Sequence, residues 1–195
     1  MQFRNEKTII TFMKKFAIYT LGCKVNQYES QLIRQILENS GLKQVDIQGQ
    51  PDLVVVNTCC VTHIASSKSR QIIRKARKSN PESKIVITGC LPAGHTGELN
   101  DILDDYIIID RKDELPERLK NMIKSAKAAD LPILTKTTPE INPKKSYRTL
   151  PGSLRAYKGQ SRAFVKVQDG CDGFCTYCII SKIRNTLSYK PLQKV

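Results

Sequence analysis

Three short apolar runs, each followed by a cysteine, constrain the fold of this chain more than any other feature. The runs and their cysteines are residues 16–21 with Cys23, residues 53–58 with Cys59, and residues 84–89 with Cys90. Short runs rich in β-branched residues, alternating with helical segments, predict parallel strands that are buried on both faces. Such sheets place their sites beyond the carboxyl ends of the strands, so we expect the three cysteines to meet at one edge.

Helical periodicity fills the gaps between these runs. Residues 28–39 place their apolar side chains at helical intervals, and Gly41 suits a C-terminal cap. Residues 106–110 predict a further strand, and residues 114–129 predict a further helix. The predicted fold class is therefore α/β, with a doubly wound parallel sheet over residues 14–129 as the N-terminal domain.

The remainder of the chain predicts a linker and the start of a second domain. Residues 130–160 contain four prolines and little periodicity, which is typical of a linker. The apolar residues 163–167 predict one strand, with which a second domain begins over residues 161–195. Residues 1–13 predict an N-terminal extension, because Met13 directly before the first strand is an alternative starting residue.

Cys60 stands beside Cys59, and only one of the two is expected at the site. Neighbouring residues at a strand end point to opposite sides. We assign the ligand role to Cys59 and a packing role to Cys60.

A second set of cysteines, Cys171, Cys175 and Cys178, follows the predicted strand at intervals of four and three residues. Three thiolates hold three irons of a four-iron cube and leave the fourth iron open to a small molecule. A zinc site needs four protein ligands, and the only histidines, His63 and His95, are distant in sequence. A thioredoxin-like pair does not need Cys171. The ligand count favours an iron-sulfur cluster over these two alternatives.

The spacing, with Tyr177 directly before the last cysteine, resembles the signature of the radical S-adenosylmethionine enzymes. The resemblance implies that the methionine part of S-adenosylmethionine chelates the open iron, and that Tyr177 lies beside the adenine. It also implies that the reduced cluster cleaves the cofactor to methionine and a 5'-deoxyadenosyl radical. Packing beside the cluster is the alternative role for Tyr177.

Four further motifs resemble the methylthiotransferase branch of these enzymes. They lie, in order, at residues 20–30, 57–62, 88–90 and 165–171. The first is most similar to the MtaB-type tRNA threonylcarbamoyladenosine methylthiotransferases, and less similar to relatives that act on isopentenyladenosine or on a ribosomal protein. The resemblance extends over residues 14 to 180.

The resemblance implies two 4Fe-4S clusters. Cys171, Cys175 and Cys178 would hold the cluster that cleaves S-adenosylmethionine, and Cys23, Cys59 and Cys90 would hold an auxiliary cluster that carries the sulfur. The product would be a methylthio group on carbon 2 of threonylcarbamoyladenosine beside the anticodon of tRNA. The implied partners are this tRNA region, S-adenosylmethionine, and donors of sulfur and electrons. Asn26 and Asn57 would orient the auxiliary cysteines or satisfy backbone groups nearby.

The C-terminal part departs from the family pattern. Relatives usually have a proline and an arginine-glycine pair after the cysteines, whereas this chain has Ser181 and then Arg184-Asn185. A full β/α barrel takes ~250 residues. We therefore expect only the beginning of a radical S-adenosylmethionine barrel. A truncated or frameshifted gene, or a fragment that a separate chain completes, would each explain this. A non-catalytic iron-sulfur or sulfur-carrying module, and a basic RNA-binding fragment, are the alternative functions.

Charge agrees with an RNA partner. The chain has 32 Lys and Arg against 18 Asp and Glu, a formal charge of +14 that attracts a phosphate backbone. Residues 68–78 predict a helix with a basic outer face, for which tRNA contact and simple solvation are alternative roles. Its basic residues are Lys68, Arg70, Arg74, Lys75, Arg77 and Lys78.

Seven cysteines without a secretory leader are typical of the reducing cytoplasm, where we expect this protein. No apolar run approaches the ~20 residues that cross a bilayer, so no membrane partner is expected.

Overall fold

The computed structural model describes residues 13–94, 99, 106–124, 150–159 and 161–194. The N-terminal part contains a five-stranded sheet of order β2–β1–β3–β4–β5 in which every pairing is parallel. The strands are β1 (Lys15–Thr20), β2 (Lys43–Gln44), β3 (Leu53–Thr58), β4 (Lys84–Gly89) and β5 (Ile107–Ile108).

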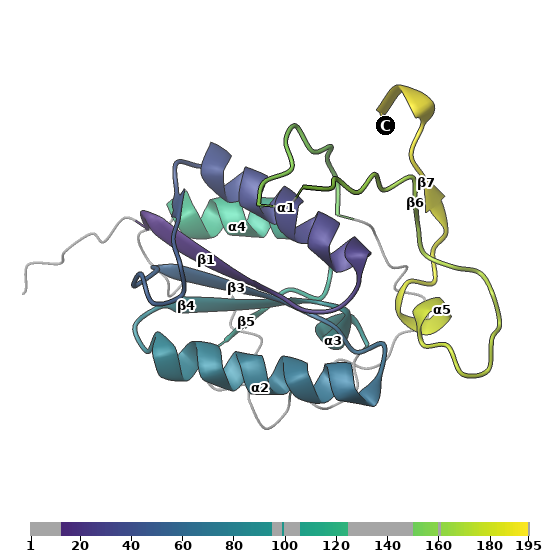
Figure 1. Cartoon of the computed structure of the whole chain (residues 1–195), viewed down its shortest axis with the longest axis horizontal. Coiled ribbons are helices and arrows are strands. Elements are labelled where there is room, and N and C mark those ends of the chain that lie inside the picture. The colour runs from purple at the N-terminus through teal and green to yellow at the C-terminus, as the bar shows by residue number, and fades with distance from the viewer. Residues whose placement is uncertain (1–12, 95–98, 100–105, 125–149, 160, 195) are drawn as a thin grey trace, which may run out of the picture.

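Helices cover both faces of this sheet (Figure 1). α1 and α4 lie on one face, and α2 and α3 lie on the other. Their bounds are α1 (Lys24–Asn39), α2 (His63–Ser79), α3 (Cys90–Ala93) and α4 (Leu115–Lys124). The predicted doubly wound α/β fold is confirmed.

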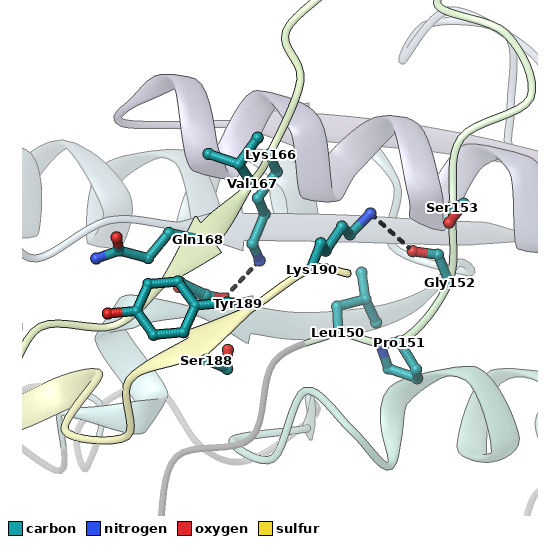
Figure 2. A pocket seen from close by; sticks show the side chains of 11 residues that line it. Leu150, Pro151, Gly152, Ser153, Lys166, Val167, Gln168, Ser188, Tyr189 and Lys190 are labelled. Atoms are coloured by element: carbon teal, nitrogen blue, oxygen red, sulfur yellow. Dashed lines mark hydrogen bonds and ion pairs between the residues drawn. The ribbon is translucent and has the colours of Figure 1, made fainter. Parts of the chain in front are cut away.

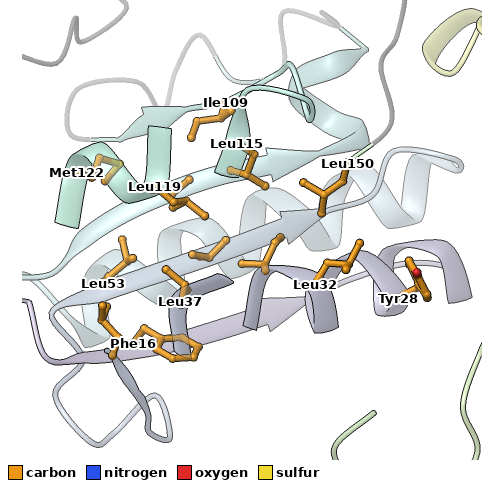
Figure 3. Packing of buried hydrophobic residues seen from close by; sticks show 14 residues of the cluster. Phe16, Tyr28, Leu32, Leu37, Leu53, Ile109, Leu115, Leu119, Met122 and Leu150 are labelled. Atoms are coloured by element: carbon orange, nitrogen blue, oxygen red, sulfur yellow. The ribbon is translucent and has the colours of Figure 1, made fainter. Parts of the chain in front are cut away.

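Two hydrophobic clusters, one on each face, hold the layers together. The first joins α1 and α4 to the sheet and includes Phe16, Leu37, Leu53 and Leu119, each fully buried (Figure 3). The second joins α2 to the other face and includes Val54, Val56, Ile73 and Ile87. β3 alternates between the two clusters, because successive side chains of a strand point to opposite faces. This two-sided burial explains why β3 is apolar along most of its length.

Two elements of this domain differ from their predicted lengths. α1 begins at Lys24, earlier than the expected residue 28. Its first turn is closed by the Gln27 N–H, which donates to the Cys23 carbonyl at 3.1 Å. The strand expected over residues 106–110 has only two paired residues, because it lies at the edge of the sheet and pairs with β4 alone. The helix expected to reach residue 129 is described as far as Lys124, and residues 125–129 lie outside the described residues.

The C-terminal part contains short elements. They are β6 (Gln168–Asp169), α5 (Ile180–Ile183), β7 (Ser188–Tyr189) and the 3-10 helix η3 (Leu192–Lys194). β6 and β7 pair with each other in antiparallel fashion. No barrel is visible among the residues that the structure describes.

The strand predicted over residues 163–167 is wrong. A strand needs a neighbour, and in the described chain β7 pairs with Gln168 and Asp169. Val167 contributes only its carbonyl, which accepts a hydrogen bond from the Lys190 N–H at 2.8 Å at the end of this pairing. Phe164 packs edge-on against Tyr157, with ring centroids 5.8 Å apart, and Val165 and Val167 are exposed. The apolar pattern of these residues therefore reflects side-chain packing and exposed surface.

Residues 150–159, the described part of the predicted linker, pack along α1. The Gln35 side chain donates to the Ser153 carbonyl at 3.1 Å, and Gln31 donates to the Lys158 carbonyl at 2.9 Å. Leu150 enters the first hydrophobic cluster. Within the described ranges, no helix has the length and apolar character needed to cross a bilayer.

Candidate metal centre

Cys23, Cys59 and Cys90, which we call the sheet triad, follow the carboxyl ends of β1, β3 and β4. The strand order reverses between β1 and β3, because β2 lies on one side of β1 while β3 and β4 lie on the other. Sheets of this kind bind their ligands in the crevice at such a reversal, outside the carboxyl ends of the strands. The sheet triad therefore lies where this topology creates a site.

Gly22 permits the close approach of the first two cysteines. Its φ is +97°, a conformation that favours glycine, and a Cβ at this position would lie 2.7 Å from the Cys59 sulfur. The backbone that carries Cys23 therefore passes directly over Cys59, with no room for a side chain between them.

The thiols of the sheet triad differ in exposure. Cys59 and Cys90 are buried, whereas Cys23 is exposed at the rim. Burial raises the pKa of the Cys59 thiol, and the fields of Cys90 and Cys23 act on Cys59 in the same direction. The site is thus closed on the protein side and open on the side of Cys23.

Asn26 and Asn57 brace the loops that carry the sheet triad. The Asn26 side-chain amide donates to the carbonyls of Leu21 and Thr58, each at 2.8 Å. The Asn57 amide donates to the Asn26 carbonyl at 2.9 Å. Both side chains therefore satisfy backbone groups, and they join the β1 and β3 loops.

Cys60 packs as expected. It belongs to the second hydrophobic cluster, and its thiol donates to the Cys90 carbonyl at 3.1 Å.

Cys171, Cys175 and Cys178, which we call the loop triad, lie between β6 and α5. The Cys178 N–H donates to the Cys175 carbonyl at 3.1 Å, which closes a turn, and the Gly173 N–H points at the Cys171 sulfur at 3.4 Å. Cys175 is exposed, and the other two thiols are half-buried. The Tyr177 ring is 90% exposed, so it is accessible to a ligand.

The donor sets of both triads suit iron-sulfur clusters. Each triad supplies three thiols, all of them free of disulfides, and thiolate is the usual ligand of iron-sulfur iron. In the described ranges, no group of three His, Cys, Asp or Glu side chains stands ready in metal-binding geometry. The fit therefore rests on the strand-end positions of the sheet triad, on the close approach of Gly22 to Cys59, and on the compact turn of the loop triad.

Comparisons with known proteins identify relatives of this chain. Residues 15–109 match the uncharacterized protein family UPF0004. The threonylcarbamoyladenosine tRNA methylthiotransferase MtaB of Bacillus subtilis (strain 168) is 34% identical over 183 residues, 94% of this chain and 39% of that protein. Its namesake from Chlamydia pneumoniae is 35% identical over 189 residues, 96% of this chain and 40% of the relative. The chain belongs to the methylthiotransferase family.

Other methylthiotransferases are also similar to this chain. The ribosomal protein uS12 methylthiotransferase RimO of Moorella thermoacetica is 28% identical over 186 residues, 94% of this chain and 40% of that relative. The chain thus spans about two fifths of the length of the methylthiotransferases that it matches.

The structure also reveals a buried group of charges that our sequence analysis missed. We call Glu29, Lys112, Lys166, Asp169 and Arg184 the ion cluster. Lys112 pairs with Glu29, Lys166 contacts both Glu29 and Asp169, and Arg184 contacts both carboxylates. Every side chain in it is at most 7% exposed. Glu29 and Asp169 lie within the methylthiotransferase motifs, but Lys112 and Arg184 are 83 and 155 positions from Glu29, and periodicity does not reveal contacts over such separations.

The cations of the ion cluster keep the Glu29 carboxyl group ionised. Burial raises the pKa of the Glu29 carboxyl, but the cations Lys112, Arg184 and Lys166 outweigh that effect and hold the pKa below its ordinary value. Glu29 is therefore ionised at neutral pH and links α1 to the C-terminal part of the chain.

A cavity of about 380 Å³ lies between residues 150–153 and the β6–β7 pair (Figure 2). Lys190 spans it and donates to the Gly152 carbonyl at 3.2 Å. None of the described residues that line this cavity is a cysteine, so we do not assign cluster chemistry to it.

The predicted basic helix is α2, capped at its start by the Thr62 hydroxyl, which accepts from the Ala65 N–H at 3.1 Å. Lys68, Arg74, Lys75 and Lys78 are exposed, and Arg70 is half-buried. Arg77 donates to the carbonyls of Pro81 and Ser83, so its guanidinium helps to hold the end of the helix. Four exposed lysines and arginines on one helix leave an open cationic face.

Proposed function

We propose that this methylthiotransferase chain takes part in the methylthiolation of tRNA and holds two 4Fe-4S clusters, one on each triad. The observation that carries the proposal is that three cysteines from distant parts of the sequence follow the carboxyl ends of neighbouring parallel strands, while Arg184 contacts both Cys90 and Cys171. When bound, the two clusters and S-adenosylmethionine supply hydrogen abstraction and sulfur transfer. The whole protein's activity is proposed from relatives that are longer than this chain.

The residues of each triad have separate roles in this proposal. Cys171, Cys175 and Cys178 hold the cluster that binds S-adenosylmethionine, and the exposed ring of Tyr177 lies against the adenine. Cys23, Cys59 and Cys90 hold the auxiliary cluster. Because Cys59 and Cys90 are buried while Cys23 is exposed, a cluster held by the sheet triad would be reached from the side of Cys23.

The proposed substrate is threonylcarbamoyladenosine beside the anticodon. Relatives named for that substrate are 31–35% identical to this chain, whereas two named tRNA-2-methylthio-N(6)-dimethylallyladenosine synthase are 28–29% identical. Modification of a dimethylallyladenosine is therefore the second candidate.

The exposed cations of α2 form the proposed tRNA interface. α2 begins shortly after Cys60, so its first turns lie at the edge that carries the sheet triad. Replacing both Lys68 and Lys75 with Gln should weaken tRNA binding and reduce the slope of log K against log salt by about 0.7–0.9 for each phosphate that is no longer neutralised. Filter binding at several salt concentrations measures this slope, and an unchanged slope would remove α2 from the interface.

Anaerobic reconstitution with iron and sulfide tests the cluster assignment. We expect about eight irons per chain, and about four in Cys175→Ala or Cys59→Ala, because each substitution removes one ligand of one cluster. Cys60→Ala is the matched control, since the neighbouring thiol packs in the core and its loss should leave about eight irons. Iron that stays at about eight in Cys59→Ala but falls in Cys60→Ala would show that the assignment at the end of β3 is reversed.

A second measurement separates the enzyme from a module that only binds iron and sulfur. Reduced, reconstituted protein should cleave S-adenosylmethionine to 5'-deoxyadenosine, and Cys175→Ala should abolish this cleavage while Cys59→Ala leaves it intact. Full iron content without cleavage would favour the non-catalytic iron-sulfur module. In either case, the proposed location of this protein is the reducing cytoplasm, which keeps its cysteine thiols available to iron.

A further inference from the structure

Arg184 is in contact with both cysteine triads. Its backbone carbonyl accepts a hydrogen bond from the N–H of Cys171, the first cysteine of the loop triad, at 3.1 Å. Its guanidinium donates from Nη2 to the sulfur of Cys90, the last cysteine of the sheet triad, at 3.3 Å. The same nitrogen donates to Asn26 Oδ1 at 3.0 Å. One residue therefore joins the two sets of proposed iron ligands.

The guanidinium is held firmly in that position. Its Nη1 lies 2.9 Å from Asp169 Oδ1 and 3.3 Å from Glu29 Oε1, and the side chain is only 4% exposed. Asp169 stands two residues before Cys171, and Glu29 lies on α1 one turn beyond Asn26. Charge-assisted bonds from a planar guanidinium fork give a definite orientation that a lysine ammonium does not reproduce.

The backbone before Arg184 is anchored as well. α5 leads directly into Arg184, and Ile183 is buried in the second hydrophobic cluster together with Cys60 and Cys90. In Figure 1, α5 lies close to α3, at the end of the sheet where the strands that carry the sheet triad finish. The contact between Arg184 and Cys90 is therefore supported by packing on one side and by the ion cluster on the other.

We propose that Arg184 is a positioning residue that sets the arrangement of the two triads and raises the reduction potential of the cluster on the sheet triad. This proposal rests on the proposed function, because it requires a cluster at Cys90. Hydrogen bonds and positive charge beside a ligand sulfur stabilise the reduced, more negative cluster. The Arg184 guanidinium supplies both to Cys90. The Arg184 carbonyl holds the start of the loop triad at the same time, so a shift of either triad is passed to the other.

The test measures the midpoint potential of the sheet-triad cluster in the full chain, with Cys175→Ala present so that this cluster is observed alone. The parent in this comparison is the chain that carries Cys175→Ala alone. Redox titration followed by electron paramagnetic resonance should give a more negative midpoint potential in Arg184→Gln than in this parent. Arg184→Lys keeps the charge and loses the fork, so it should lie between them. Lys158→Gln is the matched control, because Lys158 joins the described part of the predicted linker to α1 through Glu38 and contacts no cysteine among the described residues. Its midpoint should equal that of the parent.

Hydrogen exchange of the metal-free chain gives a readout that needs no iron. The amide of Cys171 donates to the Arg184 carbonyl, so exchange around residues 170–171 should be faster in Arg184→Gln than in Lys158→Gln. Circular dichroism establishes that the variants fold, and if Arg184→Gln does not fold, Arg184→Lys decides the question alone.

The outcomes separate the two proposals. If the parent binds about four irons and its midpoint does not differ from those of the folded Arg184 variants, the role of Arg184 is overturned and the proposed function stands. If the parent binds no iron at the sheet triad, the proposed function fails and the role of Arg184 fails with it. A negative shift in Arg184→Gln together with an unchanged Lys158→Gln supports the inference.

Discussion

The sheet triad and the loop triad supply the same chemical groups from different kinds of structure. Cys59 and Cys90 are buried at the ends of strands, and their positions depend on the register of β1, β3 and β4. Cys175 is exposed in a turn closed by hydrogen bonds between residues two or three positions apart, and one longer bond, from the Cys171 N–H to the Arg184 carbonyl, anchors the start of the loop triad. The first triad is therefore an outcome of the whole domain, and the second is largely a local arrangement.

The two triads should therefore respond differently to substitutions elsewhere in the chain. Changes in the core or in the close contacts of the sheet should disturb the sheet triad first. The loop triad should depend mainly on its own turn and on the contact with Arg184. The ion cluster joins the two regions through Arg184, so substitutions in it give the strongest test of whether the two triads respond differently.

The largest effect is expected from Glu29→Ala. This substitution removes a carboxylate that is 1% exposed and contacts Lys112, Lys166 and Arg184. Breaking a buried ion pair costs about 3–5 kcal/mol of unfolding free energy, because the partner charges remain buried. Urea unfolding followed by circular dichroism measures the loss.

Glu38→Gln is the control for Glu29→Ala. Glu38 lies on α1, as Glu29 does, and pairs with Lys158 at 2.8 Å. Both side chains of this pair are partly exposed. Exposed pairs contribute about 0.2–1 kcal/mol, so the two substitutions should differ several-fold. Equal losses would show that the ion cluster does not join the two parts of the chain.

Acidification should weaken the ion cluster to a smaller extent than Glu29→Ala. The pKa of Glu29 is lower in the folded chain than its ordinary value of 4.5. Its contribution to stability is therefore present above that ordinary value and is lost as the pH falls through the folded pKa. The free energy of unfolding should decline less steeply with acid in Glu29→Gln than in the parent, and parallel curves from unfolding at several pH values would contradict this.

A smaller effect is expected from Gly22→Ala, which tests the close approach within the sheet triad. The new Cβ would lie 2.5 Å from the Cys59 Cβ, and the backbone would keep a φ of +97°. Strained backbone costs about 1–3 kcal/mol, and the displacement of Cys59 should also lower iron binding at the sheet triad. Thermal unfolding and iron content are the measurements.

Gly41→Ala is the matched control for Gly22→Ala. Gly41 has a φ of +89°, but a Cβ there would meet nothing within 4 Å. It should therefore cost some stability and leave the iron content unchanged. If both variants lose iron equally, backbone strain is responsible and the close approach to Cys59 is not.

The smallest effect is a difference in thiol reactivity between the two triads. Cys175 is exposed, whereas Cys59 and Cys90 are buried. In the metal-free chain, iodoacetamide should modify Cys175 faster than Cys90 by about tenfold or more, the factor that an opening free energy of only ~1.4 kcal/mol produces. Peptide mass spectrometry after timed quenching measures both rates, with buried Cys60 as an internal reference. Similar rates at Cys175 and Cys90 would mean that the sheet edge opens freely.

Much of the fold could be predicted because its signals are local. The signal for each element lies within that element itself. Apolar runs mark β1, β3 and β4, and helical periodicity marks α1 and α2. The error over residues 163–167 has the same origin. Their apolar pattern resembles a strand, but strand formation depends on a partner, and β7 pairs with the following residues instead.

The sequence by itself determined the fold class and the family of this protein. The spacing of Cys171, Cys175 and Cys178 is a short-range property, and the strand ends at Cys59 and Cys90 follow from apolar patterning and turn residues. These signals were sufficient for the α/β fold and for membership of the methylthiotransferase family.

Only the tertiary structure decided how the two triads are joined. Glu29 and Arg184 are 155 positions apart, and neither periodicity nor motif spacing reports a contact over that distance. Buried charges meet because each lacks water and needs an opposite charge, and the partner is chosen by the packing of α1, β6 and α5. The contact of Arg184 with both Cys90 and Cys171 is a result of that packing.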